Sequence, residues 1–233
     1  MGVRFSFKEL SSSWIIFILF SLEMAGVAAD SNDWEYLFNG RDLAGWVQKG
    51  GSADFRVENG ELVGRPMENT ANAFLCTTSL FTNFVLECEF KMTPGMNSGV
   101  QFHSQVFNVP TQLVWSNRTY KIPAQRVHGC QIEIDSSKRA WTGSLYDEGR
   151  RGWLVTTVSN DVARHAFKTD GWNKLRLEVQ GPKISSMLNG VPAIDYVDSL
   201  QHPGFIAIQV HTVPRLTNAL EVRFKSISIK TIR

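Results

Sequence analysis

Polar and apolar residues alternate in many short stretches of this chain, most clearly in the octet HGCQIEID. Within it, Gln131, Glu133 and Asp135 alternate with Ile132 and Ile134. Side chains at i, i+2 and i+4 of a β-strand point to one face, so the octet predicts a strand with the isoleucines on one side and the polar trio on the other. Two acids on one strand face favour neither folding nor solubility in particular. The face is either merely solvated or functional.

Further short strands are expected along the chain, whereas helical periodicity is hard to find. Asn59-Gly60 and Asn189-Gly190 predict tight hairpin turns. Other strand candidates are FRVENGELVG, FLCTT, FVLECEFKM, GVQFHSQ, TGSLYDE, KLRLEVQ, KISSMLNGVPAIDYV, GFIAIQV and LEVRFKSISIKTI. This pattern predicts an all-β fold, an antiparallel β-sandwich of the jelly-roll kind or a barrel. Residues 107–127 are expected to form an irregular insertion, and long loops in compact domains are disproportionately functional.

Two other predicted strands carry polar side chains at alternating positions. Gln101 and His103 are two positions apart and are expected on the same strand face, as are Gln209 and His211. A jelly roll with a concave sheet would collect these side chains and the polar trio of the octet into one groove. The alternative, a sheet that is only solvated, would use Lys, Thr and Ser more often at such positions.

Composition fits one globular domain. The chain has 233 residues, of which 43% are hydrophobic and 20% charged, and this length suffices for one well-buried core. A net charge of +2, without a run of Lys and Arg interleaved with aromatics, predicts no nucleic-acid partner. No linker divides residues 30–233, which are expected to form a single domain.

The N-terminal residues 1–29 have the order of a secretory signal peptide. Arg4 and Lys8 precede the apolar run WIIFILFSL, and small residues follow up to Ala29. The run is too short for a comfortable membrane span of about 20 residues, although an uncleaved anchor is the alternative. We therefore expect an exported protein, periplasmic or secreted, with no membrane span after signal cleavage.

The cysteine count does not indicate a disulfide scaffold. Three cysteines are present, Cys76, Cys88 and Cys130, whereas such scaffolds carry more, in even number. Cys88 alternates with the apolar residues of its predicted strand and is expected to be a buried small hydrophobic residue. A Cys76–Cys88 disulfide between neighbouring strands is the alternative. No Cys/His spacing matches a zinc site.

Taken in order, several segments resemble the 3-keto-disaccharide hydrolase domain family. They are EYLFNGRDLAGW, VENGELVG, FVLECEFKMTPGMNSGVQFH, GCQIEID, TGSLYDEGRRGWL, GWNKLRLEVQG, LNGVPAIDY and FKSISIK, and they run from Glu35 to Lys230. The resemblance implies a concanavalin-like, laminin-G-type jelly roll of exported bacterial proteins. It also implies a carbohydrate substrate, a 3-keto-glycoside, which is a sugar already oxidised at C3.

The chemistry that this resemblance implies needs a base of tuned pKa. A ketone at C3 acidifies the proton on C2, so that a general base removes it and the oxygen on C1 leaves with the help of an acid. Burial and a like-charged neighbour raise a carboxyl pKa, which suits such a base. Glu133 and Asp135 are therefore the expected base and substrate-holding acid, and His103 or His211 is the expected proton donor.

Substrate contacts are expected from amides, one arginine, aromatic rings and further acids. The candidates are Asn97, Gln101, Gln131, Arg150 and Trp141, and by resemblance Tyr146, Asp147 and Glu148. Trp115 and Trp153 could also stack on a sugar. Alternatively, Asp147 and Glu148 are loop acids paired with Arg150 and Arg151, and His128, His165 and His202 are expected at the surface or in turns.

Two other functions compete with this one. A non-catalytic, lectin-like carbohydrate-binding module would use the same fold. A laminarinase-type glycoside hydrolase would carry the strand motif E-x-D-x-E, of which Glu133 and Asp135 match two places while Ser137 stands in the third. No cofactor is expected; calcium held by Glu133, Asp135 and Asp147 is conceivable, but no metal-loop motif supports it.

Overall fold

The computed structural model describes residues 33–215 and 219–232. The predicted signal peptide lies outside this range and stays a prediction. Within the described ranges, no helix has the length and apolar character needed to cross a membrane.

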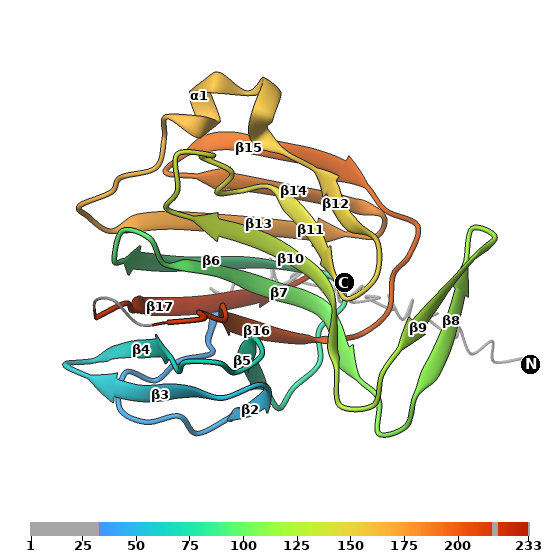
Figure 1. The fold of residues 1–233 in the computed structure, drawn as a ribbon. Coiled ribbons are helices and arrows are strands. Elements are labelled where there is room, and N and C mark those ends of the chain that lie inside the picture. Colours follow the sequence, from blue (N-terminus) through green and yellow to red (C-terminus); the bar gives the residue numbers. More distant parts are fainter. Residues whose placement is uncertain (1–32, 216–218, 233) are drawn as a thin grey trace, which may run out of the picture. The chain divides into compact units, whose positions relative to one another are not determined.

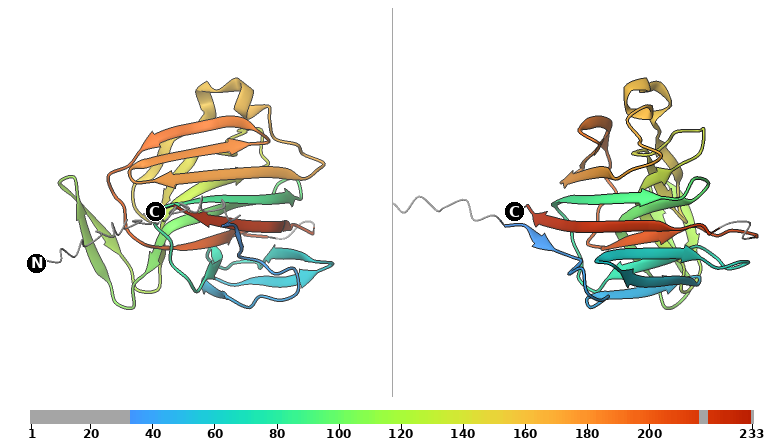
Figure 2. Two further views of the ribbon diagram at one scale, coloured as in Figure 1. Left: turned by 180° about the vertical axis from the view of Figure 1, so that it is seen from behind. Right: turned by 90° about the vertical axis from the view of Figure 1, so that its left-hand side faces the viewer.

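The domain consists of two stacked antiparallel sheets (Figure 1). The first, the back sheet, has the order β15-β14-β13-β6-β17-β4-β3, with β1 paired to β17. Its strands are β1 Glu35–Tyr36, β3 Ala53–Glu58, β4 Glu61–Pro66, β6 Phe84–Met92, β13 Asn173–Gln180, β14 Lys183–Leu188, β15 Val191–Val197 and β17 Val222–Thr231. Figure 2 shows the two layers from behind and from the side.

The second sheet, the groove sheet, has the order β12-β11-β10-β7-β16-β5-β2. Its strands are β2 Trp46–Gly50, β5 Ala73–Thr77, β7 Asn97–Val106, β10 Val127–Asp135, β11 Leu145–Glu148, β12 Gly152–Val155 and β16 Phe205–Val210. The core lies between the two sheets, where Ile132 and Ile134 of the octet pack with Leu86 and Phe90 of the back sheet. The alternating pattern of the octet therefore places Gln131 on the opposite, outer face, which we call the groove face.

The predicted all-β sandwich is confirmed, with two local differences. A one-turn helix, α1 Asp161–Arg164, follows the short 3₁₀ turn η1 Thr157–Ser159. The expected irregular insertion contains a hairpin, β8 Thr111–Trp115 and β9 Arg118–Ile122, which stands apart from both sheets (Figure 1). Its two turn residues, Ser116 and Asn117, both have positive φ, the conformation that tight hairpin turns require.

The three cysteines are free and buried. Cys88 packs in the core between the sheets, whereas Cys76 belongs to a second apolar cluster with Phe74, Phe205 and Ala207. A Cys76–Cys88 bridge is therefore not formed. Burial raises the pKa of each thiol to about 12, so none of them is a thiolate at neutral pH.

Candidate functional site

A polar pocket of about 290 Å³ opens on the groove face. It is lined by Asn72, Asn97, Arg126, Gln131, Glu133, Arg139, Tyr146, Glu148, Trp153, Gln209 and His211. These residues come from β7, β10, β11, β12 and β16 and from the segments beside them. Of the predicted site residues, six line the pocket: Asn97, Gln131, Glu133, Tyr146, Glu148 and His211.

The Glu133 carboxylate accepts three side-chain hydrogen bonds in this pocket. Its Oε1 accepts hydrogen bonds from Asn97 Nδ2 at 2.6 Å and Arg139 Nη2 at 3.1 Å, and its Oε2 accepts one from Gln131 Nε2 at 3.0 Å. Register explains the contacts, since Glu133 pairs with Gly99 of β7. A Cβ on Gly99 would come within 2.4 Å of the Gln131 side chain, so a glycine is needed there.

A chain of amides behind Glu133 fixes the direction of its donors. Gln101 Nε2 donates to Gln131 Oε1 at 2.8 Å, and Ser104 Oγ donates to Gln101 Oε1 at 2.7 Å. With its oxygen occupied in this way, the Gln131 amide presents its nitrogen to Glu133. The predicted residue Gln101 thus lies behind the pocket and acts on it through Gln131.

Burial raises the pKa of Glu133 above the ordinary glutamate value of 4.5, against the hydrogen bonds of Asn97 and Gln131. The side chain lines an open pocket, yet the residue is only 4% exposed. A partly desolvated carboxylate of this kind accepts a proton more readily than a solvated one.

Asp135 has a different position from Glu133, although both lie on one face of β10. Its carboxylate accepts hydrogen bonds from the Ser137 backbone N–H at 2.9 Å, Ser137 Oγ at 3.0 Å and Arg139 Nε at 2.9 Å. It is buried and does not line the pocket. Arg139 bridges the two acids, so Asp135 aims the guanidinium that contacts Glu133.

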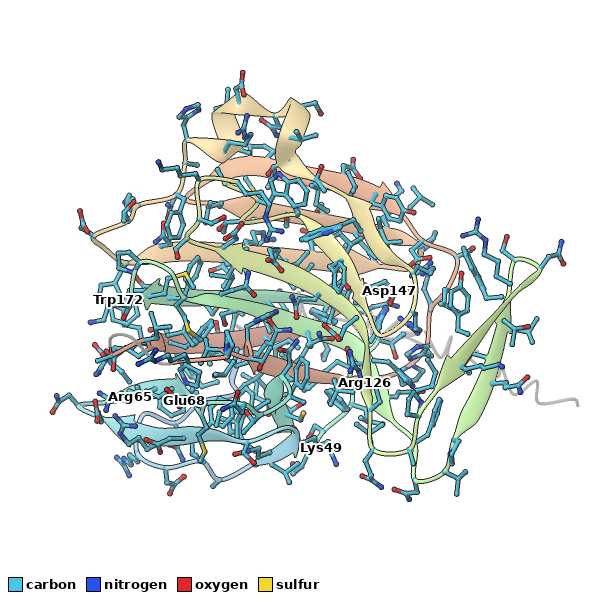
Figure 3. The ribbon with its side chains drawn as sticks, viewed as in Figure 1. Lys49, Arg65, Glu68, Arg126, Asp147 and Trp172 are labelled. Atoms are coloured by element: carbon cyan, nitrogen blue, oxygen red, sulfur yellow. The ribbon has the colours of Figure 1, made fainter. Side chains whose placement is uncertain are left out.

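The opposite wall of the pocket combines an ion pair with aromatic rings. Arg126 Nη2 donates to Glu148 Oε1 at 2.7 Å, and Figure 3 labels Arg126 beside β10. The Tyr146 and Trp153 rings are 4.9 Å apart. Burial, followed by the nearby Glu148, raises the pKa of Tyr146, which keeps its phenol a hydrogen-bond donor at neutral pH.

Two further pocket residues offer unused polar atoms. Gln209 Oε1 is buried and has no hydrogen-bond partner within the described part of the chain. His211 Nδ1 lies 2.9 Å from the Thr212 carbonyl oxygen, which it can only approach as a donor. The other ring nitrogen, Nε2, is thereby left for a ligand or a proton.

His103 does not share the groove face with Gln101, so this prediction is wrong. Its φ is +46° and the pairing register of the neighbouring strands shifts beside it. Such a bulge adds one residue and reverses the parity beyond it. Ser104 instead occupies the place beside Gln101 and donates a hydrogen bond to it. His103 turns inward against Phe84, and its Nε2 donates to the Thr82 carbonyl oxygen at 2.7 Å. A side chain at Gly129 would strike Ser104.

Asp147 and Arg150 also lie off the pocket, contrary to the prediction. Asp147 pairs with the core residue Cys130 across β10 and β11 and is fully buried on the inner face. It bonds to Arg150 Nε at 2.7 Å and to Arg151, whose guanidinium also meets Asp198 at 2.6 and 2.9 Å. The alternative pairing of Asp147 with both arginines is therefore observed. We call these four residues the inner cluster.

Three histidines, His103, His128 and His202, lie near the inner cluster. Arg150 Nη1 lies 3.2 Å from His202 Nε2, and the His202 ring lies 6.2 Å from that of His103. His128 is fully buried, which contradicts its expected surface position, whereas His165 is exposed as expected. Burial, followed by the charge of Arg150, lowers the pKa of His128 to about 4.

Sequence patterns missed Asn72, Arg126 and Arg139 because these residues lie outside regular alternation. Arg139 follows the strand in a turn, and Arg126 ends the insertion. Trp141, a predicted contact, lies at the rim, with Arg139 4.5 Å from its ring and Trp153 4.8 Å away.

The acids do not form a metal centre in the described ranges. No group of three or more His, Cys, Asp or Glu side chains there is placed to hold a metal ion. Asp147 points to the inner face whereas Glu133 and Asp135 lie on the groove face, so these three cannot share one calcium ion.

A sequence model of the 3-keto-alpha-glucoside-1,2-lyase-like domain matches residues 33–230. No curated protein matches the chain in sequence. Among solved structures, a candidate glycosyl hydrolase from Parabacteroides distasonis is 17% identical, with a TM-score of 0.56 over 86% of this chain and 94% of that one.

Two Bacillus subtilis structures are similar as well. The carbohydrate-binding module CBM66 is 14% identical, with a TM-score of 0.54 over 80% of this chain and 96% of that one. A protein of unknown function with a galectin-like fold is 10% identical, with a TM-score of 0.57 over 85% and 94%. At such identities these likenesses establish the fold only.

Proposed function

The chain belongs to the family of the 3-keto-alpha-glucoside-1,2-lyase-like domain, and we propose that it cleaves 3-keto-glycosides by elimination. The observation that carries the proposal is Glu133, a buried carboxylate with a raised pKa that lines an open polar pocket. A base for carbon acids needs this combination of access and basicity.

In the proposed reaction, the Glu133 carboxylate takes the proton from C2 and becomes a carboxylic acid. The electron pair of the C2–H bond passes toward the C3 ketone, giving an enolate. Its oxygen can be stabilised by the N–H groups of Arg126 or Arg139 or by the Tyr146 hydroxyl, which all line the pocket.

The enolate then collapses, and a C1=C2 double bond forms as the bond between C1 and the glycosidic oxygen breaks. His211 is the remaining histidine of the pocket and is the proposed donor of a proton to the leaving oxygen. Addition of water across the double bond yields the free 3-keto-sugar, which makes the net reaction a hydrolysis.

A substrate comparison tests this proposal. The purified protein is incubated in deuterated buffer with 3-keto-trehalose and, separately, with trehalose. We expect cleavage of the ketone only and deuterium at C2 of the recovered 3-keto-sugar. Equal cleavage of trehalose would overturn the elimination and would favour a direct glycoside hydrolase. The third acid of the laminarinase-type motif E-x-D-x-E is replaced here by Ser137, which donates a hydrogen bond to Asp135.

A non-catalytic sugar-binding module is the second candidate, because the pocket is rich in amide and aromatic side chains and CBM66 shares the fold. Binding of 3-keto-trehalose without any cleavage would favour it. A lectin would gain nothing from the raised pKa of Glu133, which is why we prefer the enzyme.

A further inference from the structure

One buried acceptor in the wall of the pocket takes no part in the proposed reaction. Gln209 is 1% exposed, and its Oε1 has no hydrogen-bond partner among residues 33–215 and 219–232. Nearly all buried polar atoms of native proteins are paired, and a buried acceptor without a donor is destabilising. Because Gln209 lines the pocket, a bound ligand can supply the missing donor.

Strand register places this acceptor on one side of Glu133. Gln209 of β16 pairs with Gly99 of β7, and Gly99 pairs with Glu133 of β10. Neighbouring strands lie about 4.8 Å apart, so the backbones of Gln209 and Glu133 are separated by roughly 10 Å. A ligand that reaches from the base to the acceptor therefore crosses the width of β7.

Asn72 provides a donor beside this acceptor. Gln209 pairs with Phe74 of β5, and Asn72, two residues before Phe74, lines the same pocket. The Asn72 Oδ1 accepts a hydrogen bond from the Thr212 backbone N–H at 2.9 Å, which leaves the amide nitrogen, a donor, for the pocket. One acceptor and one donor together are the complement of a hydroxyl group, which both donates and accepts.

The donors proposed for the enolate oxygen lie on the other side, toward β11 and β12. Tyr146 belongs to β11, and Arg126 donates to Glu148 of the same strand. The Arg139 Cζ lies 5.3 Å from the centre of the Trp153 ring of β12. The C3 ketone therefore faces this side. A ketone could not satisfy the acceptor on β16, because its oxygen carries no hydrogen to donate.

We propose that Gln209 and Asn72 bind the C6 hydroxyl of the oxidised sugar and thereby determine specificity. In a 3-keto-hexopyranose, the carbons that bear the C2 and C4 hydroxyls both adjoin C3, whereas C6 lies across the ring, beside the ring oxygen. C1 adjoins the ring oxygen too, and His211, the proposed proton donor to the oxygen on C1, directly follows β16. The same orientation of the sugar thus serves the base, His211 and Gln209.

The proposal rests on the proposed function and extends it by a test with substrate analogues. The wild-type kcat/KM is compared for methyl 3-keto-α-glucoside and for its 6-deoxy analogue. We expect a value about 10–100-fold lower for the 6-deoxy ketone, because the buried acceptor then stays without a donor. Equal values would overturn the proposal, and so would a loss on the 4-deoxy analogue without a loss on the 6-deoxy analogue.

Variants assign the effect to the two amides. Gln209→Met keeps the length of the side chain and removes the acceptor, so it should lower kcat/KM for the glucoside and make the 6-deoxy ketone nearly as good a substrate. Asn72→Ala should reduce the preference in the same direction. Gln180→Met, at an exposed position of the back sheet, is the matched control and should leave both values unchanged. An equal loss on both ketones in Gln209→Met would contradict the proposal.

A binding measurement separates this proposal from the proposed function. If the wild-type protein cleaves neither ketone, the enzyme proposal fails, and titration of the same two ketones decides the role of Gln209. The fluorescence of Trp153, which lines the pocket, can report binding. Tighter binding of the glucoside than of its 6-deoxy analogue, with the difference removed by Gln209→Met, supports the C6 contact. Equal binding of the two ketones by the wild-type protein would refute it.

Discussion

Two clusters of acids and arginines lie on opposite faces of β10 and β11, and only the cluster on the groove face has a carboxylate that lines the pocket. On the groove face, Arg139 joins Glu133 and Asp135 beside the pocket. In the inner cluster, Asp147 and Asp198 are closed in by their arginines and by the core. Each inner carboxylate has a guanidinium on both oxygens, which leaves no place for a substrate.

The difference shows that burial and charge do not by themselves mark a reactive site. The carboxylates of the inner cluster are at least as buried as Glu133, yet the charges of the cluster cancel in pairs, as a structural ion-pair network requires. Glu133 receives one guanidinium contact and two amide contacts. Fewer compensating charges, together with an opening to solvent, leave it able to take up a proton.

The largest effect should come from Glu133→Gln. The amide keeps the shape and some hydrogen bonding but removes the base, so kcat on 3-keto-trehalose should fall about 10²–10⁴-fold. Sugar binding, followed by tryptophan fluorescence, should change much less. Glu178→Gln, a half-exposed acid of the back sheet, is the matched control and should keep full activity.

Asp135→Asn sharpens this prediction because Asp135 acts through Arg139. We expect a smaller loss of kcat than for Glu133→Gln. The rise of kcat/KM with pH should move to lower pH, because the Asp135 charge helps to raise the pKa of Glu133 whereas the Arg139 charge lowers it. Full activity of both variants would mean that Glu133 and Asp135 have no catalytic role and only form a polar strand face.

The inner cluster should respond in stability instead. Asp147→Asn leaves Arg150 and Arg151 without their shared carboxylate, and breaking such a buried pair costs about 3–5 kcal/mol. Urea unfolding at pH 7 measures this change. Asp161→Asn, whose pair with Arg164 is exposed, should cost less than about 1 kcal/mol. A stable Asp147→Asn protein that had lost only its activity would place Asp147 in the site after all.

The smallest effect concerns pH and the histidines around the inner cluster. The pKa of His128 is about 4 in the folded protein and about 6.5 in the unfolded chain. The unfolded chain therefore binds more protons between these values, and stability is lost as pH falls through this window. From pH 7 to pH 5 the His128 contribution is at most about 2 kcal/mol.

Replacing His128 by methionine should remove this part of the pH dependence. The free energy of unfolding, measured in urea at pH 7 and pH 5, should then differ less between the two pH values than in the wild-type protein. His165→Gln, at an exposed histidine, should leave the difference as it is. An unchanged difference in the His128→Met variant would mean that His128 titrates normally.

The sequence by itself determined the sandwich and the polar face of the octet. Alternation depends only on strand geometry, so Gln131 and Glu133 could be assigned to one face and the isoleucines to the other before any contact was known. The order of the family-like segments along the chain identified the family. The alternating positions of Gln209 and His211 predicted a second strand that contributes to the pocket, and both residues line it.

Tertiary structure decided which alternating residues meet. His103 follows the right parity in sequence, but a bulge reverses it, and a bulge depends on the neighbouring strands rather than on local pattern. Alternation puts Asp147 and Glu148 on opposite faces of β11, but only the pairing of Asp147 with the core residue Cys130 decides which of the two faces inward. Arg126 and Arg139 come from turns, where side-chain direction follows from packing because no regular period applies.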